Sequence, residues 1–522
     1  MKLVKEINVI KKSYRRGRLE VAVAYPSVYE AAARSLSVQM LYFYLNSFDE
    51  ISAERFVLRK LRGAEPPAVS LESGRPLRDF RLIVFSVHYE PDYVNIVRLL
   101  LAGGVDPLAE KREHVVVVGG PPVIANPEPL SRIADVLVVG EIESTMPILV
   151  EQAVTYAGDK RAFLDSLKPE QGFYVPSRGD EQVSFNYPAE LPLEFHPAAQ
   201  FQPENGEWRR TTIIEVARGC SRRCRFCMEG HIFTPQRDRP LEQIVQLAEK
   251  GSRFNGSNQL TLVALSLFDH READRILETL IESGYKISLP SLRIDTLTRE
   301  RIELLAKSGQ KTLVLAPETA NVGLSLVLGK PLLEERLLEA TREARRAGFK
   351  SLKLYFMVGL PGEGDVRAIA NLVKRISEHS GFRGERELKL SVSVFVPKPQ
   401  TPMQWFGMED PRTVRRKLEA LVSALGGIAD VRPYKPAWAY VQCVLSRGGS
   451  ELTDVLIEWA LRGGGLHGWR EAARGNGLDT DAYTRPLDPG AEVPWAKVRL
   501  RYPREYLERS YLLCMKQISE LG

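Results

Sequence analysis

The chain has 522 residues, of which 44% are hydrophobic and 26% are charged, and its formal net charge is +6. This length exceeds one ordinary domain and predicts about two or three, and the composition is typical of a soluble globular protein. The longest apolar stretches, such as residues 260–267, are far too short to span a membrane. The first 18 residues carry charges throughout and lack the apolar core of a signal peptide, so we expect a cytoplasmic protein.

The cysteine content argues against one further class of protein, and the net charge leaves another open. Only five cysteines are present and three of them lie within eight residues, which argues against a disulfide framework. A net charge of +6 is small for this length, so it permits an RNA partner without indicating one.

Residues 1–185 alternate between apolar strands and helices. Strands are expected at 19–25, 82–87, 115–118 and 136–139, with helices at 28–46 and about 91–102. Near-continuous Val/Ile strands separated by helices predict an α/β fold, with a Rossmann-like (flavodoxin-type) parallel sheet covered on both faces. Ligands of such sheets lie beyond the carboxyl ends of the strands. Gly119, Gly120 and Gly140 stand at such ends, where a missing side chain would let a large ligand approach the backbone.

The rest of the chain divides by composition into three parts. Residues 186–210 are proline-rich and irregular, which is typical of a linker. From 211 to 405 a strand–helix rhythm returns, with strands expected at 212–216, 260–265, 287–289, 312–316, 352–357 and 389–396 and helices such as 241–250 and 332–347. Residues 406–522 are less regular and predict a small C-terminal α+β domain, an accessory or substrate platform.

Three cysteines form the most specific pattern in the chain. Cys220, Cys224 and Cys227 follow the strand expected at 212–216. Three thiolates at this spacing can hold three irons of a four-iron, four-sulfur (4Fe-4S) cluster, which leaves the fourth iron open to a small molecule. The alternative is a zinc site with His231 as the fourth ligand, but zinc ligands commonly come as two separated pairs.

The cysteine loop resembles that of the radical S-adenosylmethionine (radical SAM) superfamily, in which three cysteines follow the first strand of the barrel. The resemblance implies a 4Fe-4S cluster whose open iron chelates S-adenosylmethionine (SAM). It also implies reductive cleavage of SAM to a 5′-deoxyadenosyl radical and an electron donor such as ferredoxin or flavodoxin. The six strand–helix units of 211–405 would then form a partial (β/α)6 TIM-like barrel, with its chemistry at the carboxyl ends of the strands.

The N-terminal segment 115–144 resembles the cobalamin-binding domain found ahead of many radical SAM domains. It lacks the Asp-x-His-x-x-Gly motif that supplies a lower axial histidine, and neither His88 nor His114 fits that motif. In this subgroup the cofactor is often held without that histidine, so the resemblance keeps cobalamin as a third cofactor. The alternative is an empty Rossmann-like domain that only supports the barrel.

By the same resemblance, four residues of the barrel take part in binding SAM. Glu318 follows the fourth strand and would contact the methionine amine or the ribose, and Gly359 and Gly362 would let the backbone approach the adenine. Ser266 stands where the superfamily usually has a Gly-Gly-Glu run, so only its hydroxyl or backbone could take that role. The alternatives are an acid in the first turn of a helix for Glu318 and a plain strand-to-helix turn for the glycines.

Other charged residues near the barrel mouth leave two interpretations open. Arg293 and Asp295 end the third strand and would either face the active site or form a structural ion pair. Arg237 and Arg239 follow the cysteine loop and are expected to be solvated or paired. No catalytic side chain that donates or accepts hydrogen is identified.

Residues 26–46, the expected barrel, and residues 444–449 and 494–500 resemble an uncharacterised family of radical SAM proteins with a cobalamin-type N-terminal domain. The expected function is radical SAM catalysis, with cobalamin-dependent methylation of an unactivated carbon as the finer hypothesis. The substrate is left open among a small molecule, a lipid, a peptide and tRNA. One alternative is a cobalamin-free enzyme of rearrangement, oxidation or cross-linking. Methylthiolation is less favoured, since only Cys443 and Cys514 remain for a second cluster. A cluster-bearing RNA-binding or assembly factor, using the basic stretch 412–417, is the non-enzymatic alternative.

Overall fold

The computed structural model describes residues 5–13, 17–179, 182–204 and 210–521. The chain forms two compact units. Unit 1 comprises Met1–Arg210, Val444–Tyr483 and Glu492–Pro503, and unit 2 comprises Thr211–Cys443, Thr484–Ala491 and Arg504–Gly522. Residues 406–522, which the sequence analysis treats as one C-terminal domain, are thus divided between the two units.

Unit 1 is built on a six-stranded sheet with the order β3-β2-β4-β5-β6-β7. The strands are β2 (Leu19–Val28), β3 (Ile51–Leu58), β4 (Leu82–Ser86), β5 (Val115–Gly119), β6 (Val136–Val138) and β7 (Phe173–Tyr174). The first five are parallel, and β7 is antiparallel to β6. Counted from β2, the order 2-1-3-4-5 is that of flavodoxin-like folds. The predicted Rossmann-like parallel sheet is confirmed.

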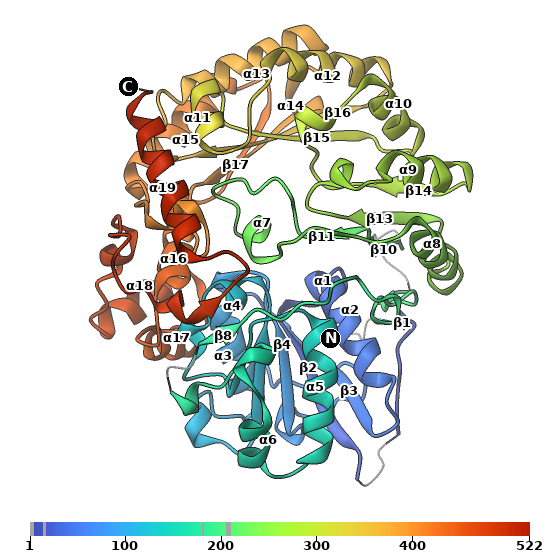
Figure 1. The fold of residues 1–522 in the computed structure, drawn as a ribbon, viewed down its shortest axis with the longest axis vertical. Coiled ribbons are helices and arrows are strands. Elements are labelled where there is room, and N and C mark those ends of the chain that lie inside the picture. Colours follow the sequence, from blue (N-terminus) through green and yellow to red (C-terminus); the bar gives the residue numbers. More distant parts are fainter. Residues whose placement is uncertain (1–4, 14–16, 180–181, 205–209, 522) are drawn as a thin grey trace. The chain divides into compact units, whose positions relative to one another are not determined.

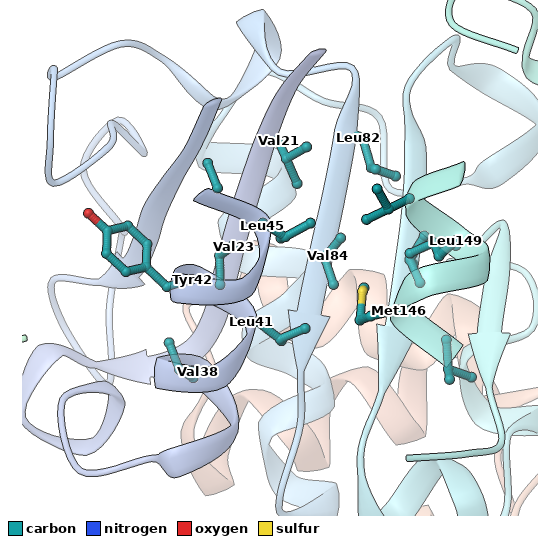
Figure 2. Packing of buried hydrophobic residues seen from close by; sticks show 14 of the residues in the cluster. Val21, Val23, Val38, Leu41, Tyr42, Leu45, Leu82, Val84, Met146 and Leu149 are labelled. Carbon is teal, nitrogen blue, oxygen red and sulfur yellow. The ribbon is translucent and has the colours of Figure 1, made fainter. Parts of the chain in front are cut away.

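Helices cover both faces of this sheet (Figure 1). The helices between the strands of unit 1 are α1 (Tyr29–Ala32), α2 (Leu36–Asn46), α3 (Tyr93–Ala102), α4 (Pro121–Ala125), α5 (Ile142–Thr155) and α6 (Lys160–Ser166). Unit 1 also contains α17 (Leu452–Leu461) and α18 (Gly465–Gly475), which pack against each other. Figure 2 shows Val21 and Val84 of the strands packing against Leu41 of α2 and Met146 of α5 in one buried cluster. In the same cluster Val21 and Val23 of β2 are alternate residues, as are Leu82 and Val84 of β4, which is what the two-residue period of a strand requires. Helix α3 packs against α17, which comes from the C-terminal part of the chain.

Unit 2 contains two parallel sheets with the orders β10-β13-β14 and β15-β16-β17-β18. The strands are β10 (Thr212–Glu215), β13 (Gln259–Val263), β14 (Lys286–Ser288), β15 (Thr312–Glu318), β16 (Ser351–Val358), β17 (Leu388–Val394) and β18 (Asp430–Pro433). A parallel bridge between Leu292 and Leu315 joins the two sheets. Within the described ranges no pairing links β18 to β10, so the barrel is partial, as predicted. Strand β18 adds one strand beyond the six expected.

Helices follow the strands of unit 2, and the last part of one of them, α16, belongs to unit 1. They are α7 (Met228–Ile232), α8 (Leu241–Asn255), α9 (Ala273–Glu282), α10 (Arg299–Lys307), α11 (Val322–Val327), α12 (Glu334–Arg346), α13 (Arg367–Ser380), α14 (Gly384–Glu387), α15 (Pro411–Leu425), α16 (Pro436–Arg447) and α19 (Arg504–Ser519). In α8 the buried residues Leu241, Ile244, Leu247 and Ala248 recur every three or four positions, which places them on one face. Short strand pairs complete the structure: β1 (Glu6–Ile7) with β9 (Gln202–Pro203), β11 (Ala217–Arg218) with β12 (Arg237–Asp238), and β8 (Val183–Ser184) with β19 (Val498–Arg499).

The last helix, α19, packs into the core of unit 2. Tyr511 and Cys514 of α19 share a buried cluster with Leu324 of α11 and with Trp405. The rings of Tyr511 and Trp405 lie 5.4 Å apart. In the part of the chain that the structure describes, no helix combines the length and apolar character needed to cross a bilayer.

Candidate functional site

The loop after β10 and β11 gathers the three cysteines of the motif. Cys220 and Cys224 are buried, and Cys227 is half-buried. All three are free thiols that lie near enough to interact electrostatically. Burial raises the pKa of Cys220, and it raises the pKa of Cys227 to about 12. Metals bind the thiolate form of cysteine, so a metal held by these thiols would have to offset this cost of deprotonation with its positive charge.

Arg225 fastens this loop to two distant elements. Its backbone N–H donates to Leu328 O over 2.9 Å. Its Nη1 donates to Val327 O at 2.8 Å and to Gln517 Oε1 at 2.6 Å. The N–H of Met403 donates to Arg225 O at 3.3 Å. The end of α11 and the C-terminal helix α19 therefore hold the residue that directly follows Cys224.

We expect Arg225→Met to loosen the loop. The variant loses two hydrogen bonds of a charged donor and leaves the carbonyl of Val327 with one partner fewer, which predicts a loss of about 2 kcal/mol in the free energy of unfolding. The amount of iron that the variant retains after anaerobic reconstitution and gel filtration should also fall. Arg367→Met, at an exposed arginine paired with Asp365, is the control. Equal stability and iron content in the two variants would contradict this role.

The arrangement of thiols suits a cluster better than a single ion. Over the described ranges, no three His, Cys, Asp or Glu side chains converge as ligands of one metal ion. A four-iron cluster needs no such convergence, since each thiolate binds a different iron. His231, the fourth ligand of the zinc alternative, is buried with Nδ1 2.8 Å from Cys227 O.

Glu318 ends β15 in an unusual backbone conformation. Its φ is +66°, and the pairing with β16 is irregular between Leu315 and Glu318. Left-handed residues other than glycine cost energy and cluster at binding sites. The Oε1 atom of Glu318 accepts a hydrogen bond from Lys330 Nζ at 2.7 Å. Glu318 precedes α11, which begins at Val322, so the acid does not lie in the first turn of a helix. The sequence analysis did not identify Lys330, because no local pattern links it to Glu318.

Ser266 lies after β13 and is buried. Its hydroxyl hydrogen-bonds the carboxylate of Asp269, which also accepts from Arg222 Nε at 2.8 Å. Burial opposes ionisation of Asp269, but the bonds from Arg222 and Ser266 prevail and hold its pKa below the usual range. Ser266 thus has a partner within the protein, and its role toward SAM stays a prediction.

Arg293 and Asp295 form an ion pair with each other, and Arg293 also lies against the cysteine loop. They form a bidentate ion pair, with Nε to Oδ1 at 2.9 Å and Nη2 to Oδ2 at 3.0 Å. The remaining nitrogen, Nη1, lies 3.4 Å from Cys224 Sγ. Arg222 Nη1 also reaches Asp295 Oδ2 at 3.3 Å. The ends of β13 and β14 are therefore connected to the cysteine loop by charged groups.

Gly359 and Gly362 both have positive φ, +76° and +77°. The N–H of Gly359 donates to Glu363 Oε2 at 2.9 Å, and the same oxygen accepts from Lys417 Nζ at 2.7 Å. A Cβ at Gly362 would lie 3.0 Å from Ile518 Cγ2. The positive φ values and the close packing of Ile518 are sufficient reasons for glycine in this turn. Contact with adenine stays a prediction.

The glycines of unit 1 stand at strand ends, as expected, but the chain itself occupies the space beside two of them. A Cβ at Gly120 would lie 1.9 Å from Val87 O, and one at Gly140 would lie 2.8 Å from Asn186 O. A Cβ at Gly119 would lie 3.3 Å from the nearest side chain. Close backbone packing accounts for glycine at 120 and 140. A ligand beside the three glycines stays a prediction.

A polar group marks the point where the strand order of unit 1 reverses, between β2 and β4. Ser37 Oγ lies 2.7 Å from Ser86 Oγ and 2.8 Å from His88 Nε2. His88 is exposed at the carboxyl end of β4, with its ring edge-on to Tyr25 at 5.6 Å. Ligands of flavodoxin-like sheets bind at this switch point. From the sequence, His88 was tested only as an axial ligand of cobalamin, and its position at the switch point of the sheet was not predicted.

Comparison with known families agrees with this geometry. Residues 37–176 match the family model described as "Radical SAM proteins, N-terminal", and residues 214–373 match that of the radical SAM superfamily. The chain therefore belongs to the radical SAM superfamily and is a radical SAM enzyme. Membership implies a 4Fe-4S cluster and SAM as cofactors and requires a reductant.

The chain is similar to an uncharacterized protein of Methanocaldococcus jannaschii, with 29% identity over 84% of this chain and 90% of that one. Among solved structures it is similar to the radical SAM methyltransferase TsrM from Kitasatospora setae with cobalamin and a [4Fe-4S] cluster bound. That likeness has a TM-score of 0.51 and 13% identity and covers 88% of this chain and 100% of that one. The cobalamin-dependent radical SAM enzyme OxsB gives the same TM-score and identity, with 96% and 80% covered. At this identity the structural likeness shows a shared fold.

Proposed function

We propose that Cys220, Cys224 and Cys227 hold the 4Fe-4S cluster with which this radical SAM enzyme cleaves SAM reductively. We further propose that unit 1 binds cobalamin and that the reaction methylates an unactivated carbon. The observation that supports the cluster best is the gathering of two buried thiols and one half-buried thiol on one fastened loop, at the carboxyl end of the first strand of a partial barrel. The bound cofactors supply the electron transfer and the methyl group.

The chain's own residues bind and orient the cofactors and exclude water from them. The thiolates of the loop ligate three irons. The carboxylate of Glu318, held in place by Lys330, is suited to accept hydrogen bonds from the ammonium or ribose of SAM. Phe226 and Met357 are partly buried against the apolar cluster formed by α11, α19 and residues 403–406, and this apolar surface limits water beside the loop.

Two observations support the proposal that unit 1 binds cobalamin. The solved structure of TsrM contains bound cobalamin, OxsB is described as cobalamin-dependent, and both share this fold. The sheet of unit 1 has a flavodoxin-like order, and its switch point presents Ser37 and the exposed His88. Hydroxyl and imidazole groups fit a large polar cofactor in kind, because they can donate and accept hydrogen bonds.

Anaerobic reconstitution with iron, sulfide and hydroxocobalamin tests this proposal. After gel filtration, wild-type protein should retain iron near four atoms per chain, as the cluster requires, with near-stoichiometric cobalt. We expect His88→Ala to bind cobalamin about fivefold more weakly, since one lost hydrogen bond costs about 1 kcal/mol, while its iron content stays unchanged. Visible spectra and metal analysis measure both cofactors in the same sample. A wild-type protein without iron would overturn the cluster assignment.

A cobalamin-free radical SAM enzyme is the second candidate. The close packing around Gly120 and Gly140 favours it, because the backbone already occupies the space beside these strand ends. In that case unit 1 is a scaffold, and the reaction is a rearrangement, an oxidation or a cross-linking. Reconstituted wild-type protein with iron but without cobalt would establish this alternative.

A further inference from the structure

Arg293 places a hydrogen-bond donor against one of the thiols of the cysteine loop. It follows β14 and is separated from Cys224 by 69 positions in sequence. Its side chain is only 10% exposed. Nη1 lies 3.4 Å from Cys224 Sγ, which is within hydrogen-bonding distance for sulfur.

The guanidinium is held rigidly in this orientation. Asp295 accepts from Nε and Nη2, which fixes the plane of the group and leaves Nη1 directed at the sulfur. Arg222 bonds both Asp295 and Asp269, so two arginines and two aspartates form one charge-balanced network. A structural ion pair would be complete with Asp295 alone. The contact with Cys224 is additional to it.

We propose that Arg293 is a positioning residue that sets the reduction potential of the cluster by donating a hydrogen bond to Cys224 Sγ. The inference rests on the proposed function, in which Cys224 is a cluster ligand. Reduction adds one electron, supplied by an external donor, and its negative charge is partly shared by the ligating sulfurs. A charged N–H donor stabilises the more negative state, so it raises the potential.

A matched pair of variants isolates this effect. Arg293→Met removes the donor to sulfur and leaves Asp295 paired with Arg222. Arg301→Met removes an arginine of the same unit that forms a similar bidentate pair with Asp274 and donates its other hydrogen bond to the carbonyl of Thr296. Both variants lose one positive charge and one ion pair. Only the first changes the hydrogen bonding of Cys224.

The measurement is a dithionite titration with redox mediators, followed by electron paramagnetic resonance (EPR) on anaerobically reconstituted full-length protein without SAM. We expect Arg293→Met to lower the ratio of reduced to oxidised cluster about tenfold at a given potential, which is a shift of about 59 mV for one electron. Arg301→Met should titrate like wild type, and Arg293→Lys, which keeps a charged donor, should lie between. An unchanged potential in Arg293→Met would overturn the inference.

A second measurement covers the case in which Arg293→Met assembles no cluster. Protein labelled with 15N only at the guanidinium nitrogens of arginine should show a nitrogen coupling to the reduced cluster by pulsed EPR, and Arg293→Lys should lose it. No coupling in the labelled wild type would overturn the inference. The two proposals fail differently: a wild type without any cluster signal overturns the proposed function, whereas a normal cluster insensitive to Arg293 overturns only this inference.

Discussion

Cys224→Ala is expected to abolish assembly of the 4Fe-4S cluster. The protein supplies three thiolates and leaves one iron open, so the loss of one thiolate leaves two irons without a protein ligand. Cys220→Ala and Cys227→Ala should have the same effect, since the three thiols lie on one loop and interact with one another. Iron and sulfide analysis with the visible spectrum of reconstituted protein measures the loss, which should approach the whole of the wild-type content.

The two remaining cysteines provide the controls. Cys443 and Cys514 are fully buried and lie outside the loop, Cys443 in α16 and Cys514 in α19. Cys443→Ala and Cys514→Ala should therefore keep the wild-type iron content, after a check that each variant is folded. A full iron complement in Cys224→Ala would remove the basis of the cluster assignment.

Glu318→Gln is expected to weaken SAM binding about tenfold to hundredfold. The substitution keeps the size of the side chain, and it removes the negative charge that opposes the ammonium of SAM. A hydrogen bond to a charged group contributes about 1.5–3 kcal/mol, and each 1.4 kcal/mol is about tenfold in affinity. Equilibrium dialysis of SAM against reconstituted, oxidised protein measures the affinity without turnover.

Two controls separate this binding role from the ion pair with Lys330. Asp274→Asn removes a carboxylate of the same unit that pairs with Arg301, and it should bind SAM like wild type. Lys330→Met breaks the ion pair but leaves the carboxylate of Glu318 in place, so its affinity should fall less than that of Glu318→Gln. If Glu318→Gln bound SAM with wild-type affinity, the carboxylate of Glu318 would have a structural role and no role in SAM binding.

Features of this protein that depend on neighbouring residues could be predicted from the sequence, whereas features that depend on distant residues could not. Periodicity predicted β2, β4, β5 and β6 in unit 1 and β10, β13, β14, β15, β16 and β17 in unit 2, because burial on both faces of a parallel sheet leaves near-continuous apolar runs. Strand β3 (Ile51–Leu58) was missed, because polar and charged residues interrupt its apolar run although the strand is buried throughout. The three cysteines and their loop were equally readable, because a cluster motif is a matter of spacing within a few residues. Strand β18 was missed, because Asp430–Pro433 has no apolar run and is defined by its pairing with β17.

By itself, therefore, the sequence determined the class of enzyme: two α/β domains and a three-cysteine loop after the first strand of the second domain. Only the tertiary structure decided what surrounds that loop. Arg293 reaches Cys224 across 69 positions, and Gln517 reaches Arg225 across 292. Parallel strands bring their carboxyl ends to one edge whatever the length of chain between them, so residues without any common sequence pattern become neighbours. Such contacts follow from packing, which no local period or spacing encodes.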